Sequence, residues 1–135
     1  MGTWDASPFG NDYAADFASE LDELPLVERA AAIRGALEDV IREAGYLDSF
    51  EGVRGVAAAA LVAVQCPGGP STDSVYGPDE PVPELPVDLR ALAVKVLDRV
   101  LAPESELREL WDEVDGREWL DELDRLRAPL AASPN

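Results

Sequence analysis

Histidine is absent from this sequence, and cysteine occurs only once, at Cys66. Without histidine the chain cannot perform Ser-His or Cys-His catalysis, bind zinc through histidine, or use the usual pH switch. A single cysteine excludes an internal disulfide, and beside an apolar run it is most simply a small buried hydrophobe. We therefore expect no catalytic residue, no cofactor and no metal ligand, and we favour a protein that is not an enzyme.

Basic residues are scarce, since 11 lysines and arginines stand against 28 acids and leave a net charge of −17. A protein with this balance repels nucleic acid and anionic membranes and attracts basic partners. Residues 1–24 hold six acids and no base, and residues 104–127 hold ten acids and four bases. We expect any partner to be a basic protein held at these two ends, with solubility as the alternative reason for the acidity.

The apolar runs are short, and none approaches the ~18 residues that a membrane-spanning helix needs. The first residues contain neither the basic region nor the apolar region of a secretory signal. We therefore expect a cytoplasmic location. Ten arginines against one lysine, together with abundant alanine, fit a GC-rich bacterial genome.

Apolar residues recur with the period of an α-helix along most of the chain. The pattern predicts one all-α domain over residues 1–135, a compact orthogonal bundle of five to six helices. The predicted helices cover about 12–22, 26–44, 50–65, 86–101, 104–114 and 117–128. Residues 56–64 are apolar on all sides, so we expect the third helix to be the buried centre of the bundle.

Several local expectations accompany this helix pattern. Ser49 is the expected N-cap of the third helix, and Val27 belongs to the predicted apolar stripe of the second. Pro129 is expected to end the last helix and to leave residues 131–135 as a frayed tail. Residues 67–86 contain six prolines and three glycines, which predicts a long loop. We expect Tyr76 to hold that loop against the helices.

The N-terminal segment combines large aromatic residues with turn residues, unlike the polar composition of most flexible termini. Trp4 and Phe9 flank a turn at Pro8, and Asn11 or Asp12 can cap the helix that follows. We predict an ordered segment in which Trp4 and Phe9 pack onto the helices.

The same segment contains the pattern W-x-x-x-P-F-x-N-D-x-A-A-D-F. It resembles the signature of a bacterial family of domains of unknown function, number 4259, and the resemblance extends over nearly the full chain. The sequence departs from the family pattern at Asp5, where a glycine is expected after the tryptophan. The resemblance implies a bacterial setting and no mechanism. The matching residues are Trp4, Pro8, Phe9, Asn11, Asp12, Ala14, Ala15, Asp16 and Phe17.

Two groups of acids are candidates for a partner surface. The first is Asp12 and Asp16. Together with Asn11 they could also bind a cation, although helix capping and a favourable charge at the helix N-terminus explain this cluster better. The second lies on the last predicted helix and comprises Glu118, Asp121 and Glu122.

The alternative function is a magnesium-dependent, all-α nucleotide hydrolase. Rows such as Glu106-x-x-Glu109-x-x-Asp112 place carboxylates on one helix face, as such enzymes do. The row lies opposite apolar residues, however, which is typical of the solvated face of an amphipathic helix. Trp4, Trp111 and Trp119 could line a ligand pocket, but core packing is the simpler interpretation. The sequence thus favours a protein-binding module with an antitoxin-like or immunity-like role.

Overall fold

The structure is a computed structural model that describes residues 12–66, 84–113 and 116–132. These residues form six α-helices and no named strand, which confirms the predicted all-α class. An isolated parallel bridge joins Leu47 to Ser105. The helices are α1 (Asp12–Glu23), α2 (Leu26–Arg42), α3 (Ser49–Val64), α4 (Asp88–Leu101), α5 (Glu106–Asp112) and α6 (Arg117–Ala132).

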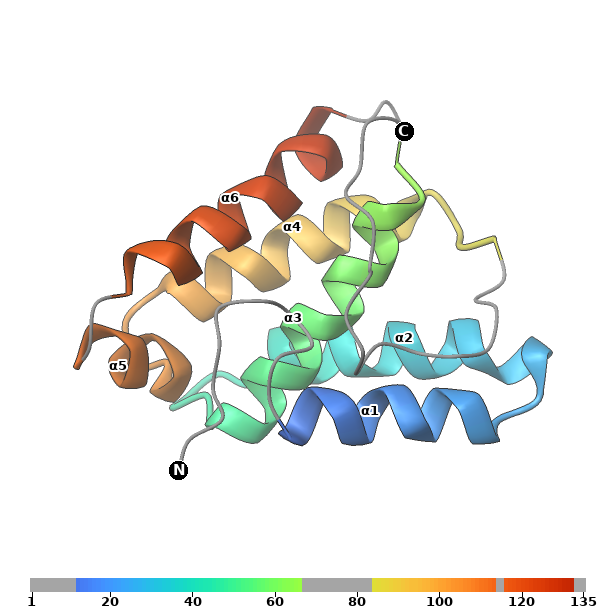
Figure 1. Cartoon of the computed structure of the whole chain (residues 1–135), viewed down its shortest axis with the longest axis horizontal. Helices are drawn as coiled ribbons and strands as arrows, with labels where there is room; N and C mark the ends of the chain where they lie inside the picture. Colours follow the sequence, from blue (N-terminus) through green and yellow to red (C-terminus); the bar gives the residue numbers. More distant parts are fainter. Residues whose placement is uncertain (1–11, 67–83, 114–115, 133–135) are drawn as a thin grey trace.

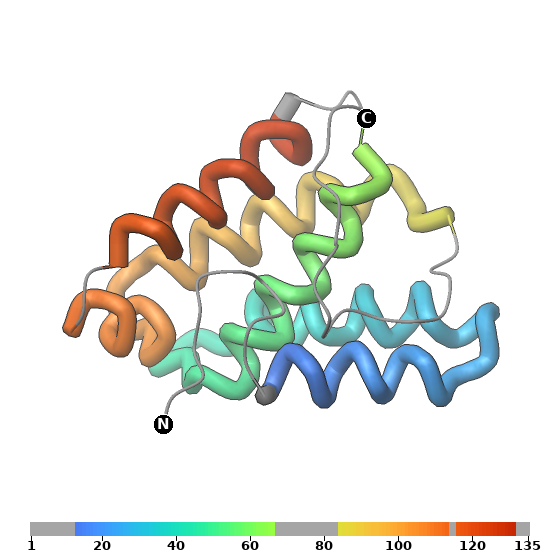
Figure 2. The backbone as a smooth tube through the Cα atoms, viewed as in Figure 1, coloured from blue at the N-terminus to red at the C-terminus, as the bar shows by residue number. Residues whose placement is uncertain are grey.

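Helix α3 is the centre of the bundle, as the apolar run predicts. It contacts each of the five other helices. Figure 1 shows α3 crossing the molecule, with α1 and α2 towards one edge of the view and α4 and α6 towards the other. The tube in Figure 2 shows the same arrangement without side chains. Every residue from Val56 to Ala63 is buried, because small side chains let the neighbouring helices approach from several directions.

The N-cap of α3 differs from the prediction. Asp48, and not Ser49, precedes the helix, and its side chain accepts a 2.9 Å hydrogen bond from the backbone N–H of Glu51. Ser49 is the first helical residue, and Glu106 satisfies its backbone N–H from another helix. Either residue is a good cap by type, and the course of the chain through the Leu47 bridge places Asp48 in the extended conformation that a cap needs.

Two further predictions are wrong: Val27 does not lie on the buried stripe of α2, and Pro129 does not end α6. Val27 is 85% exposed, because it lies two residues, or about 200° around the helix, from the buried Arg29. Pro129 lies inside α6, which continues through Ala131 and Ala132 in place of the expected tail. Leu126 and Leu130 are both buried on either side of it, and this packing holds the last turn despite the missing backbone donor.

Some of the remaining predictions concern described residues and can be compared with the structure, and others concern residues outside them. Phe17 and Cys66 are buried, as expected. Leu85 is buried, and its N–H donates to Oε1 of Gln65 at 2.8 Å, which ties the end of the 67–86 segment to the end of α3. Trp4, Phe9, Tyr76 and residues 133–135 lie outside the described residues.

Gly55 lies where α3 meets α2 and α4. A Cβ atom at this position would be 2.5 Å from Cγ2 of Val40 and 3.1 Å from Cγ1 of Val96. Both valines are fully buried, so neither can move aside into solvent. Close helix packing therefore requires glycine at this point of α3.

We expect Gly55→Ala to lower the free energy of unfolding by about 1–2 kcal/mol in chemical denaturation. Overpacking a core costs about 1–3 kcal/mol, which exceeds the roughly 1 kcal/mol that alanine gains over glycine in a helix. Gly35→Ala is the matched control, because nothing lies within 4 Å of a Cβ at that position in α2. The control should be stabilised by about 0.5–1 kcal/mol. Equal gains in both variants would contradict the close approach at Gly55.

Candidate functional site

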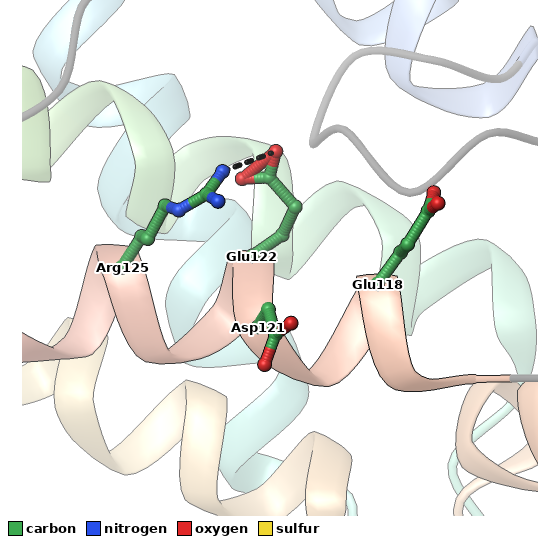
Figure 3. Close-up of a pocket in the computed structure, with 4 residues that line it drawn as sticks. All are labelled: Glu118, Asp121, Glu122 and Arg125. Carbon is green, nitrogen blue, oxygen red and sulfur yellow. Dashed lines mark ion pairs between the residues drawn. The ribbon is translucent and has the colours of Figure 1, made fainter.

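The exposed side of α6 carries the group of acids that the sequence singles out. Glu118, Asp121, Glu122 and Arg125 line an open depression of about 260 Å³. Figure 3 shows these side chains along α6, with the guanidinium of Arg125 turned towards Glu122. Their spacing of three and four residues brings them together along the helix. The other side of α6 is apolar and packs into the core through four buried residues, Trp119, Leu123, Leu126 and Leu130.

Most of the negative charge at this depression is unpaired. Glu122 forms an ion pair with Arg125 at 3.5 Å, in which the arginine side chain is 70% exposed. The side chains of Glu118 and Asp121 form no hydrogen bond or ion pair with another residue in the described part of the chain. Three carboxylates and one guanidinium therefore leave an excess of negative charge that is open to solvent. We call Glu118, Asp121 and Glu122 the α6 acidic face.

The carboxylates of α5 are used differently. Oε1 of Glu106 accepts the backbone N–H of Ser49 at 2.7 Å and so satisfies a free donor in the first turn of α3. Glu109 accepts a 2.7 Å hydrogen bond from the hydroxyl of Tyr46, and this bond raises the pKa of Tyr46 to about 12. Asp112 pairs with Arg108 at 3.2 Å. All three carboxylates thus have partners within the fold, and Glu109 and Asp112 are also exposed, as the amphipathic pattern predicts.

The described residues contain no metal-binding cluster. Across residues 12–66, 84–113 and 116–132, no group of three or more Asp, Glu or Cys side chains is arranged to hold a metal ion. The carboxylates of α5 and α6 do not converge on one cavity, because the depression at α6 is lined by α6 residues alone. No observation here favours the nucleotide hydrolase alternative.

The two predicted parts of the partner surface lie apart. Asp16 is exposed on α1, and the side chain of Asp12 lies outside the described residues. Helices α1 and α6 both contact α3, and they lie towards opposite edges of Figure 1. The fold therefore does not bring Asp16 and the α6 acidic face into one site.

One family model matches residues 2–122 of the chain, and its description is "Domain of unknown function (DUF4259)". The chain belongs to this family. The matched residues of the DUF4259 domain include the whole α6 acidic face and end before Arg125. No curated protein and no solved structure matches the chain. Within the described residues, none of the helices has both the length and the apolar character needed to cross a membrane.

Two of the three tryptophans of this DUF4259 domain form a packing contact. Trp111 and Trp119 stack at a centroid distance of 5.9 Å with an interplanar angle of 9°. Trp119 is buried and Trp111 packs partly buried against the core, so the pair joins α5 to α6. Core packing is confirmed for these two residues, and Trp4 lies outside the described residues.

Sequence reasoning missed Arg29, which is buried in the DUF4259 domain. Its Nε donates to the backbone carbonyls of Leu21 at 2.9 Å and Leu24 at 3.0 Å. These carbonyls belong to the last turn of α1 and the residue after it, where helices leave acceptors without intrahelical donors. The sequence held one signal for the burial of Arg29. Arg29 precedes Ile33 by four residues and so shares its face of α2, and Ile33 is buried.

Proposed function

We propose that this protein is a non-enzymatic binding module of the bacterial cytoplasm that engages a basic partner protein. An antitoxin-like or immunity-like role is one concrete form of this function. The observation that carries the proposal is the contrast between two neighbouring helices. On α5, Glu106 and Glu109 accept hydrogen bonds from distant segments of the fold. On the α6 acidic face, Glu122 has only its exposed pair with Arg125, and the side chains of Glu118 and Asp121 have no partner within the described residues.

The chemistry of the α6 acidic face suits lysine or arginine side chains. A partner's guanidinium or ammonium group could bind Glu118 and Asp121 through charge-assisted hydrogen bonds, which are stronger than neutral ones. The existing pair between Glu122 and Arg125 is solvent-exposed, and such pairs contribute only about 0–1 kcal/mol. A partner's base can therefore replace Arg125 at Glu122 at little cost.

The charge of the whole chain supports the same proposal. A net charge of −17 attracts a basic protein over a distance and speeds their encounter. Asp12 and Asp16 on α1 belong to the proposed surface as a second, separate contact, because the fold does not place α1 beside α6. We assign the main contact to the α6 acidic face.

The experiment measures how fast a partner recovered from the native cytoplasm associates with the chain at increasing salt. The variant Glu118→Gln, Asp121→Asn, Glu122→Gln should associate about tenfold more slowly at low salt, since complementary charge acts mainly on the association rate. The difference should vanish as the screening length falls from about 8 Å at physiological salt to about 3 Å at 1 M. Dissociation should change less.

The control variant is Glu28→Gln, Glu38→Gln, Asp39→Asn on α2. It changes the net charge by the same amount, and α2 lies towards the opposite edge of Figure 1 from α6. At physiological salt, where the Debye length is about 8 Å, its association rate should stay within about twofold of the wild type, because exposed charges farther away than this length are largely screened. The proposal would be refuted by an association rate that changes neither with salt nor with the α6 substitutions. The acidity would then serve solubility alone.

A further inference from the structure

An exposed aromatic patch lies at the start of α1 and α3. The ring of Tyr13 meets that of Phe50 edge to face at a centroid distance of 5.3 Å. Both residues are partly open to solvent, with Tyr13 38% exposed and Phe50 47% exposed. The guanidinium of Arg54 lies 5.2 Å from the centroid of Phe50 and completes the patch. We call Tyr13, Phe50 and Arg54 the aromatic patch.

The aromatic patch is held in place by contacts on its buried side. Arg54 also lies 4.9 Å from the ring centroid of Phe17, which is buried in the core. A 2.9 Å ion pair with Glu20 fixes the same guanidinium from α1. Because α1 and α3 pack together, the two exposed rings form a preformed apolar surface with a fixed cation beside it.

The chain itself supplies a matching apolar segment next to this patch. Residues 1–11 lie outside the described residues and join α1 directly at Asp12. They include Trp4 and Phe9. Ser7-Pro8-Phe9-Gly10 carries the residues that a type I turn favours at its first, second and fourth positions. Phe9 precedes Asp12 by three residues, so its Cα is at most about 11 Å from the start of α1.

We propose that the segment containing Trp4 and Phe9 docks on the aromatic patch, with the ring of Phe9 against that of Phe50. Covalent attachment gives the segment an effective concentration in the millimolar range, which a second molecule does not reach. A second copy is disfavoured further by the repulsion between two chains of net charge −17. The carboxylate of Glu20 is already paired with Arg54 at 2.9 Å, so the aromatic patch itself offers no free acid to a basic partner.

A double-mutant cycle on the full chain tests the contact. Phe9→Ala, Phe50→Ala and the double variant are compared by chemical denaturation. The double variant should lower the folding equilibrium constant about 2- to 10-fold less than the product of the two single effects, as paired aromatic rings do. The matched control combines Phe9→Ala with Leu26→Ala, since Leu26 is 50% exposed at the start of α2. That pair should combine additively.

Two further measurements make the outcome decisive. If Phe50→Ala does not fold, Phe50→Leu replaces it in the cycle. In the wild-type chain, nuclear Overhauser effects between the rings of Phe9 and Phe50 are expected. Additive single effects together with the absence of these nuclear Overhauser effects would overturn the proposal. A dimer in sedimentation that Phe50→Ala converts to monomer would also overturn it, because a second copy would then be the occupant.

Discussion

Replacing Phe17 with alanine is expected to lower the free energy of unfolding by about 3–5 kcal/mol, the usual result of truncating a large core aromatic. Phe17 is only 1% exposed. Its ring lies within the interface between α1 and α3 and also faces the guanidinium of Arg54. Truncation would leave a cavity beside the central helix and remove the ring that supports Arg54. Chemical denaturation with a two-state fit measures the effect.

The control for Phe17→Ala is Val27→Ala. Val27 also belongs to the apolar pattern of the sequence, yet it is 85% exposed. Its truncation should change the free energy of unfolding by no more than about 0.5 kcal/mol, as most surface substitutions do. A loss below about 1 kcal/mol for Phe17→Ala would show that α1 contributes little to the core, contrary to the burial of its ring.

Arg29→Met is expected to lower the free energy of unfolding by about 2–3 kcal/mol. Methionine keeps much of the side-chain volume but removes the Nε donor to the carbonyls of Leu21 and Leu24. A hydrogen bond to a charged group contributes about 1.5–3 kcal/mol. The carbonyl of Leu21 also accepts the N–H of Leu24 at 3.2 Å, so the expected loss comes from the hydrogen bonds of the guanidinium and not from an acceptor left empty. Thermal or chemical denaturation checks the size of the loss.

Arg34→Met is the matched control on the same helix. Arg34 forms an ion pair with Asp88 at 3.1 Å, and its side chain is 37% exposed. The hydrogen bond from Arg34 lowers the pKa of Asp88, but an exposed pair of this kind contributes at most about 1 kcal/mol. If Arg34→Met lowered the free energy of unfolding as much as Arg29→Met, the greater contribution of Arg29 could not be attributed to its burial.

The described part of the bundle was largely predictable from the sequence. Helical periodicity is a local property, so the existence and order of the helices and the central place of the alanine-rich α3 follow from spacing alone. Helix ends were less predictable. Pro129 lies inside α6 because the burial of Leu126 and Leu130 outweighs the backbone bond that proline lacks.

The role of individual polar residues was decided only by the tertiary structure. By sequence, Glu106 and Glu118 are equivalent acids on amphipathic helices. Glu106 meets the N–H of Ser49, 57 positions away in the chain, while Glu118 meets no partner within the described residues. The sequence determines how many carboxylates each helix carries and their spacing along it. Whether a carboxylate serves the fold or stays available to a partner depends on donors from distant segments, because a hydrogen bond requires contact that only the packed helices provide.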